Sequence, residues 1–316
     1  MTSFSVVIPT LRRPEPLRGV IESLLACVPL PDEIIIVDGD PEESARHVVD
    51  ELASNTSALR LVYLVSETGS TRQRNRGIDA STCDVLVFLD DDVVVDTAIF
   101  AHFADAYRDS QLVGVTGNVN GTEPRRIGSR NSRLRRWLIG TRKQGTFTRF
   151  GYPRYLVDRN REQDVERQPG GLASARREAA VVTRFDELLT GYAVAEDEDF
   201  SYRLSRLGRV RYVPSISIWH EQHGVRDQRA VNTKLVLNRT YLFKKNFPQT
   251  ALARTQFGFF LATLLAHRLM NREWDAARGL LDGYRELWRR QKLLDDPRSF
   301  ILGTRVETEP PSGSKT

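Results

Sequence analysis

Short apolar runs alternate with helical patterns along the first half of the chain. Four of these runs are rich in branched residues and stop at turn signals, which is typical of strands, and the fourth, VLVFL, is apolar throughout, as expected of a strand buried on both faces. They are SVVIP near the amino terminus, EIIIVD over Glu33–Asp38, LRLVYLV over Leu59–Val65, and VLVFLD from Val85.

Helical stretches separate these four runs. Helices are predicted from Pro14 to about Cys27, from the Gly39-Asp40-Pro41 turn onward, and within the segment from Gly69 to Ala80. Strands that alternate with helices predict an α/β fold, built on a doubly wound and mostly parallel sheet.

The second half has a mixed pattern. It predicts a strand over Leu112–Val119, a short helix from Ala173, a helix from about Ala195 to Leu207, two short strands (RVRYVP and SISIWH), and helical structure from Gly224 to about Leu294. We therefore expect an α/β domain over 1–224, a helical region over 225–300 and a disordered tail over 301–316.

The bulk composition is that of a globular protein, with 28% charged residues and a net charge of +5. Cys27 and Cys83 lie in apolar segments, so buried free thiols in a reducing compartment are expected. The start has no basic segment ahead of an apolar one, which argues against a signal peptide. The longest apolar stretch, Phe257–Ala266, is too short to span a bilayer. A cytoplasmic location is the expectation.

Basic residues are distributed unevenly. The stretch Arg125–Lys143 holds eight of them and no acidic residue. Such a stretch is compatible with phosphate, nucleic acid or anionic lipid as a partner, although solvated arginines on helix faces are the commoner explanation.

Two of the predicted strands end in aspartate. Asp38 follows the second strand, and Asp90, Asp91 and Asp92 follow the fourth. The carboxyl ends of parallel strands open on the same edge of a sheet, where ligands bind. Adjacent carboxylates repel one another unless a cation lies among them, and Mg²⁺ prefers oxygen ligands. An acidic surface turn is the alternative.

A second acidic cluster, Glu196-Asp197-Glu198-Asp199, begins a predicted helix. Acidic residues in a first turn complement the helix dipole, at about 0.3–1 kcal/mol each. Four in a row exceed that need, and their mutual repulsion raises the pKa of a carboxyl group.

The ordered segments resemble one enzyme family. VVIPTLRRPEPL, EIIIVDGD, TRQRNRGI and FLDDD, followed by PGGLASARREA, FDELLTGYAVAEDEDFSYRLSRLG and VPSISIWH, are similar to inverting family 2 glycosyltransferases of the GT-A fold. The resemblance covers about residues 4–223. It implies a nucleotide-binding half over 1–120 and an acceptor or catalytic half over 121–224.

The resemblance also implies a reaction and a set of site residues. The reaction is metal-dependent, inverting transfer of a sugar from a nucleotide-diphospho-sugar to a hydroxyl of a glycan or lipid-linked acceptor. Asp197 would be the general base. Asp90, Asp92 and His220 would bind Mg²⁺ or Mn²⁺, with His223 as the rival ligand. The nucleotide-sugar would contact Pro9, Thr10, Arg13, Asp38, Arg74, Asp90 and Asp91, and the sugar and acceptor would contact Gly170, Gly171 and Glu196.

Other functions fit the sequence less well. A sugar-nucleotide pyrophosphorylase would carry a glycine-rich phosphate loop after the first strand, and PTLRRPEP has no glycine. A non-catalytic protein that binds nucleic acid or another polyanion gives no account of Asp38, the triple aspartate or Asp197. A degenerate relative is disfavoured because every carboxylate position is filled.

The carboxyl-terminal pattern leaves two alternatives. Trp274, Ala277, Leu281, Tyr284 and Trp288 recur at helical spacing between arginines. Such a helix either lies on an anionic membrane at the inner face or packs on protein, namely the catalytic domain or a second protomer. Packing on protein is the commoner outcome.

Overall fold

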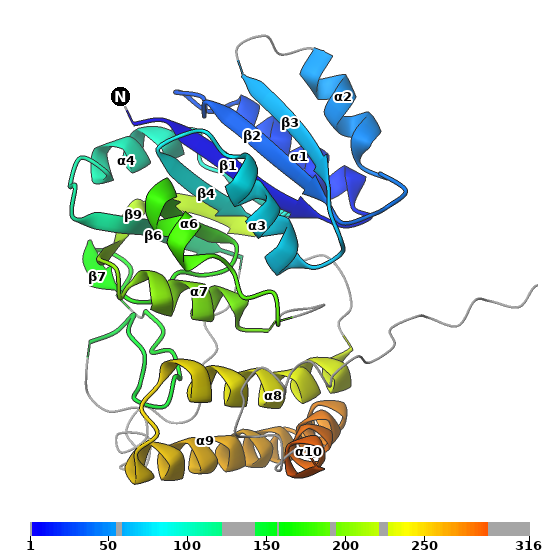
Figure 1. Cartoon of the computed structure of the whole chain (residues 1–316), viewed down its shortest axis with the longest axis vertical. Coiled ribbons are helices and arrows are strands. Elements are labelled where there is room, and N and C mark those ends of the chain that lie inside the picture. Colours follow the sequence, from blue (N-terminus) through cyan, green and yellow to red (C-terminus); the bar gives the residue numbers. More distant parts are fainter. Residues whose placement is uncertain are drawn as a thin grey trace, which may run out of the picture.

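The structure is a computed structural model that describes residues 2–54, 59–121, 143–156, 158–189, 194–220 and 227–289. A central sheet forms one end of the molecule, and a layer of helices forms the other (Figure 1). The strand order is β3-β2-β1-β4-β8-β6-β9-β5, with β7 beside β9. The expected α/β class and central, mostly parallel sheet are confirmed.

The amino-terminal strands pair in parallel because helices cross over between them. They are β1 (Phe4–Thr10), β2 (Glu33–Asp38), β3 (Arg60–Val65) and β4 (Val85–Leu89). The crossovers are α1 (Pro14–Leu25), α2 (Arg46–Ser54) and α3 (Ser70–Ala80). Residues on one sheet face pack against α1, α2 and α4 (Ile99–Ala106), and those on the other against α3, α6 (Arg177–Thr183) and α7 (Glu196–Leu204).

The helix expected at Pro41 begins five residues later, at Arg46. The intervening turn is held by aspartate side chains that accept backbone hydrogen bonds. Asp38 accepts from the N–H groups of Asp40 (2.8 Å) and Ala45 (3.3 Å), and Asp40 accepts from that of Glu42 (3.4 Å). These local bonds compete with helix formation, which explains the delay.

The short helix predicted from Ala173 is wrong. Leu172–Arg176 is strand β8, which lies antiparallel between β4 and β6 (Leu112–Asn120), and α6 begins only at Arg177. Ser174 is buried there, and its hydroxyl hydrogen-bonds the backbone of Val115. The small residues of this segment have no clear helical or strand period. Pairing with β4 and β6 therefore decided that it forms a strand.

The two short strands predicted near 209–220 are one strand, β9 (Arg209–His220). Its pairing with β6 shifts register between Thr116 and Asn118, opposite Tyr212 and Ser217. Pro214 lies in that irregular stretch, where a residue without an N–H group is tolerated. The short strands β5 (Val93–Val95) and β7 (Gln163–Val165) also pair with β9. The chain therefore bends at the proline without leaving the sheet.

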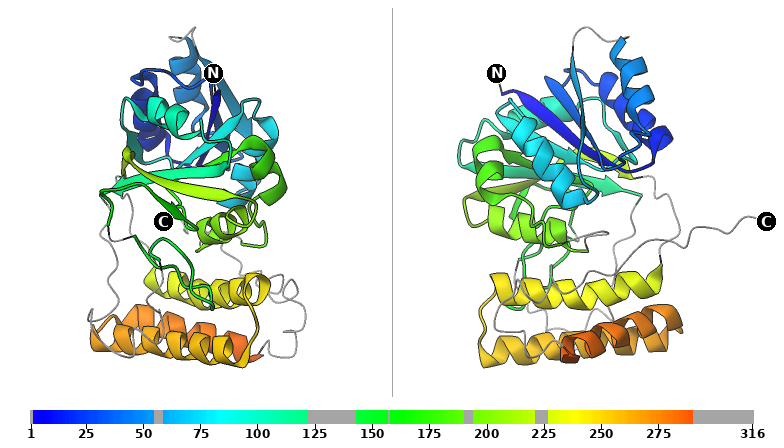
Figure 2. Two further views of the ribbon diagram at one scale, coloured as in Figure 1. Left: turned by 90° about the vertical axis from the view of Figure 1, so that its left-hand side faces the viewer. Right: turned by 45° about the vertical axis from the view of Figure 1, so that its right-hand side comes forward.

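Three helices form the end of the molecule remote from the sheet (Figures 1 and 2). They are α8 (Gln228–Asn246), α9 (Ala251–Met270) and α10 (Trp274–Arg289). The backbones of α8 and α10 approach so closely that a Cβ atom on Gly279 would lie 2.2 Å from the carbonyl oxygen of Arg229. Within the described ranges, no helix combines the length and the hydropathy needed to cross a bilayer.

Two helical glycines offer a matched test of this packing. A Cβ atom on Gly77 in α3 would lie 2.3 Å from Cγ1 of Val7, whereas one on exposed Gly19 in α1 meets nothing within 4 Å. We expect Gly77→Ala to lower the free energy of unfolding by about 1–3 kcal/mol. Gly19→Ala is expected to raise it by about 0.5–1 kcal/mol. Urea unfolding measures both, and equal shifts would contradict the close contact between α3 and β1.

Candidate functional site

Three predicted metal ligands converge at the end of β4. Asp90 and Asp92 directly follow that strand, and β5 pairs with β9 so that Val93 lies opposite His220. The imidazole Nε2 lies 3.5 Å from Oδ2 of Asp90 and 3.2 Å from Oδ1 of Asp92. One donor atom from each residue falls within 4.8 Å of the others. Two carboxylates and an imidazole at this spacing fit a divalent cation such as Mn²⁺ or Mg²⁺.

Asp91 points to a different neighbour. Its carboxylate accepts hydrogen bonds from Thr10 Oγ1 at 2.8 Å and from Arg13 Nη1 at 2.5 Å. Arg13 also bonds Asp92 through Nη2 at 2.8 Å. Burial raises the pKa of Asp91 to about 6, against the opposing effect of Arg13. Arg13 therefore balances the charge of this turn from the side of β1.

Arg74 connects the aspartate turn to α7. This arginine of α3 is 3% exposed, and its guanidinium bonds Asp90 at 2.8 Å and Glu196 by a close ion pair. Ser70 donates a further hydrogen bond to Glu196 at 2.5 Å. Both acidic partners of Arg74 belong to the protein, and the contact with the nucleotide-sugar that the resemblance implies stays a prediction.

Asp38 lies at the same sheet edge, where the β1–β2 register places it opposite Thr10. Pro9 lies opposite the preceding residue, Val37. Its side chain is fully buried. Besides the two backbone N–H groups of the following turn, the Tyr63 hydroxyl donates to it at 2.7 Å. The contact between Asp38 and the nucleotide-sugar that the resemblance implies stays a prediction.

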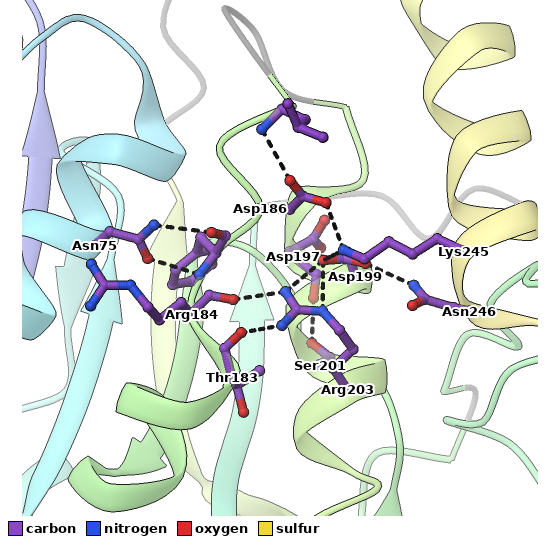
Figure 3. Close-up of polar contacts among 12 residues, drawn as sticks. Asn75, Thr183, Arg184, Asp186, Asp197, Asp199, Ser201, Arg203, Lys245 and Asn246 are labelled. Atoms are coloured by element: carbon purple, nitrogen blue, oxygen red, sulfur yellow. Dashed lines mark hydrogen bonds and ion pairs between the residues drawn. The ribbon is translucent and has the colours of Figure 1, made fainter. Parts of the chain in front are cut away.

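The acidic cluster at the start of α7 divides its four carboxylates among cations from different elements. Glu196 pairs with Arg74, and Glu198 forms a buried two-bond pair with Arg239 of α8. Asp199 is fully buried and bonds Arg203, Lys245 and Asn246 (Figure 3). These contacts fix α7 between α3 and α8.

Asp197 has the loosest pairing of the four. Its Oδ2 lies 3.4 Å from Nη2 of Arg167, and both side chains are 20% exposed. Burial raises the pKa of the Asp197 carboxyl above its ordinary value, and Arg167 opposes that rise. An accessible carboxylate with a raised pKa is suited to accept a proton.

Gly170 and Gly171 lie between this carboxylate and the metal cluster. A Cβ atom on Gly170 would lie 3.5 Å from that of Asp197. One on Gly171 would lie 3.3 Å from Cδ2 of His220 and 3.5 Å from Oδ2 of Asp90. The glycine pair therefore brings backbone close to both groups and leaves space beside them.

The sequence did not single out several of these contacts. Arg167 and Tyr63 each bond a carboxylate of the predicted site, and Arg239 and Lys245 bond the two carboxylates that follow Asp197. The one available signal was the position of Arg167, three residues before Gly170. The rival ligand His223 lies outside the described residues, as does 122–142, which holds all but the last residue of the basic stretch Arg125–Lys143.

The family model described as "Glycosyl transferase family 2" matches residues 5–181. The chain belongs to this family. A curated relative, the succinoglycan biosynthesis protein ExoM of Rhizobium meliloti (strain 1021), is 32% identical over 146 residues, which cover 43% of this chain and 47% of ExoM. The chain thus spans about half the length of the curated relative it matches.

Solved glycosyltransferase structures share the GT-A fold. The mannosyltransferase PcManGT from Pyrobaculum calidifontis, in complex with GDP-Man and Mn²⁺, has a TM-score of 0.56 and 13% identity over 97% of this chain and 86% of its own. GalNAc-T7 with UDP, GalNAc and Mn²⁺ has a TM-score of 0.58 and 17% identity over 77% of this chain and 48% of its own. Membership in family 2 favours glycosyl transfer over a pyrophosphorylase or a polyanion-binding protein.

The pair between Arg239 and Glu198 holds the family's predicted base helix against α8. We expect Arg239→Met to lower the free energy of unfolding by about 3 kcal/mol, because it leaves a buried carboxylate without its cation. Arg229→Met in the same helix removes an exposed pair with Asp282 and should have a much smaller effect. Thermal and urea unfolding compare the two variants, and similar losses would contradict a buried link between α7 and α8.

Proposed function

We propose that this chain transfers a glycosyl group from a nucleotide-diphospho-sugar to an acceptor hydroxyl, with Asp197 as the general base and inversion at the anomeric carbon. The observation that carries the proposal is the placement of Asp197 and the Asp90–Asp92–His220 cluster on either side of Gly170 and Gly171. A donor and an acceptor hydroxyl need to meet between a leaving-group site and a base.

The proposed donor site rests on the charged groups that would stabilise the departing nucleoside diphosphate. A divalent cation held by Asp90, Asp92 and His220 would neutralise the charge that develops on the nucleoside diphosphate as it leaves. Arg13 and Arg74 hold the aspartates in place from two sides. Solved relatives whose titles name GDP-Man or UDP together with Mn²⁺ support a nucleotide and a metal of this kind.

The acceptor side rests on Asp197. Its carboxylate takes the proton of the acceptor hydroxyl, so the oxygen becomes a better nucleophile for the anomeric carbon. Glu196, Glu198 and Asp199 are committed to close ion pairs, which leaves Asp197 as the base within this cluster. A single displacement with one base inverts the anomeric configuration, whereas retention by double displacement needs a carboxylate nucleophile as well. The acceptor we propose is a hydroxyl of a glycan or of a lipid-linked sugar.

Two aspartate variants test the two sides separately. Asp197→Asn should lower transfer at least about a hundredfold and leave Mn²⁺-dependent binding of UDP or GDP intact. Asp92→Asn should weaken that binding. Calorimetry measures binding, and release of nucleoside diphosphate measures turnover with the sugar nucleotide that gives the largest thermal shift. Asp79→Asn, a half-exposed aspartate paired with Arg184, is the control. Unchanged turnover in Asp197→Asn would refute the assignment of the base.

We also propose that α10 makes peripheral contact with an anionic membrane. Trp274, Leu281 and Trp288 are spaced seven residues apart, so they share one face of this helix, and the two tryptophans are 57% and 77% exposed. The opposite face of α10 packs on α8. Residues 227–289 carry eleven basic and five acidic residues, which complements anionic headgroups.

Vesicle flotation tests this contact with the full chain. The protein should float with vesicles of phosphatidylcholine and phosphatidylglycerol and not with phosphatidylcholine alone. Replacing Trp274 and Trp288 by alanine should lower the partition at least about tenfold. Trp219→Ala, which removes a 49% exposed tryptophan of β9, is the matched control. Failure to float refutes membrane contact, and dimerisation that is lost in the double variant would assign the same face to a second copy.

A further inference from the structure

Among the described residues, Arg167 is the cation that pairs with the predicted base, and the backbone fixes where its side chain starts. It follows β7 and precedes the Pro169-Gly170-Gly171 turn, and its N–H group donates to the carbonyl of Gly145 at 3.0 Å. The N–H of Glu166 donates to the same carbonyl at 2.8 Å. Arg167 therefore begins at a hydrogen-bonded position close to Asp197.

The guanidinium is held from one side by an aromatic ring. Its central carbon lies 4.9 Å from the centre of the Tyr155 ring, which is within the range of a cation–π contact. On the other side, Nη2 faces Oδ2 of Asp197 at 3.4 Å. Among the described residues, Oδ1 of Asp197 accepts no protein hydrogen bond. The contact is thus one-sided, with one carboxylate oxygen held and the other open.

We propose that Arg167 is the positioning residue of the general base: it holds Oδ2 of Asp197 so that Oδ1 faces the acceptor hydroxyl. This inference rests on the proposed function, because it needs Asp197 to be the base. When the acceptor proton moves to Oδ1, the guanidinium keeps the carboxyl group in the same orientation and favours its ionised form before the transfer.

The geometry of Arg167 differs from that of a structural ion pair. Arg239 and Glu198 are both less than one-tenth exposed and make two hydrogen bonds, whereas Arg167 and Asp197 are each one-fifth exposed and make one long contact. A loose, partly solvated pair of this kind contributes little to stability. Removing the Arg167 guanidinium is therefore expected to change the orientation and pKa of Asp197 more than the stability of the fold.

The charges around Asp197 set the direction of the effect. Burial raises the pKa of its carboxyl; Arg167, Arg239 and Arg74 lower it, and Glu198 raises it. Arg167 is the largest of the opposing influences. The base works in its ionised form, so activity falls as the pH drops through this pKa. Without Arg167 the pKa rises further, and the acidic limb of the pH–rate profile moves to higher pH.

Substitutions of Arg167 test the inference in the full-length protein. Arg167→Met should move the acidic limb of kcat/KM upward by about one pH unit. It should lower kcat about ten- to a hundredfold and leave the KM of the sugar nucleotide unchanged. Arg167→Lys should restore most of the limb, because it keeps the charge. Arg203→Met, which removes a guanidinium of α7 that pairs with Asp199 instead, should leave the limb in place.

A titration without substrate gives a second readout. In protein labelled with ¹³C at aspartate carboxyls, the Asp197 signal is the one that is lost in Asp197→Asn. Its midpoint should rise in Arg167→Met, while the unfolding temperature stays close to that of the wild type. A fall in kcat without movement of the limb or of this midpoint would overturn the inference, as would wild-type values of all three.

The outcomes also separate this inference from the proposed function. If Asp197→Asn keeps its turnover, the proposed function fails and the inference fails with it. If Asp197→Asn is inactive while Arg167→Met keeps the wild-type acidic limb and midpoint, the base assignment stands and only the positioning role of Arg167 is refuted.

Discussion

The buried guanidinium of Arg74 is the contact on which the arrangement of the site depends. Asp90 directly follows strand β4 and Glu196 begins α7, and a guanidinium is costly to bury without anionic partners. A single arginine of α3, 3% exposed, satisfies both. It therefore sets the distance between the strand ends, where the proposed metal ligands lie, and the helix that carries Asp197. Arg13 has a matching role on the far side of the aspartate turn, where it bonds Asp91 and Asp92.

The carboxyl-terminal helices share in building the site. Arg239 and Lys245 of α8 pair with Glu198 and Asp199, the two residues that follow Asp197 (Figure 3 shows Lys245 and Asp199). Carboxylates crowded at one helix start repel one another, and cations from outside that helix remove the repulsion. Asp197, the proposed base, is thus placed by contacts from the sheet side and from the carboxyl-terminal helices together. The alignment with PcManGT extends over 97% of this chain.

Local signals predicted β4, since a run such as VLVFL is stable only where both of its faces are covered, as in a sheet interior. These local signals failed where tertiary packing decides the secondary structure. Leu172–Arg176 has the composition of a short helix, yet the gap between β4 and β6 recruits it as a strand. Pro214 marked a break between two strands, and a shift of register absorbed it within one. The turn before α2 depends on side chains of Asp38 and Asp40 that no periodicity records.

By itself, the sequence determined which chemical groups are available and roughly where the backbone presents them. Aspartates at strand ends, glycines before β8 and acidic residues at a helix start follow from order along the chain, because parallel strands share an edge. Only the tertiary structure decided which cation meets which carboxylate. Arg74, Arg167 and Arg239 look alike in the sequence, and they differ in burial and in partner. Such pairing joins residues from 16 to 122 positions apart, so it exists only once the sheet and the helices have packed.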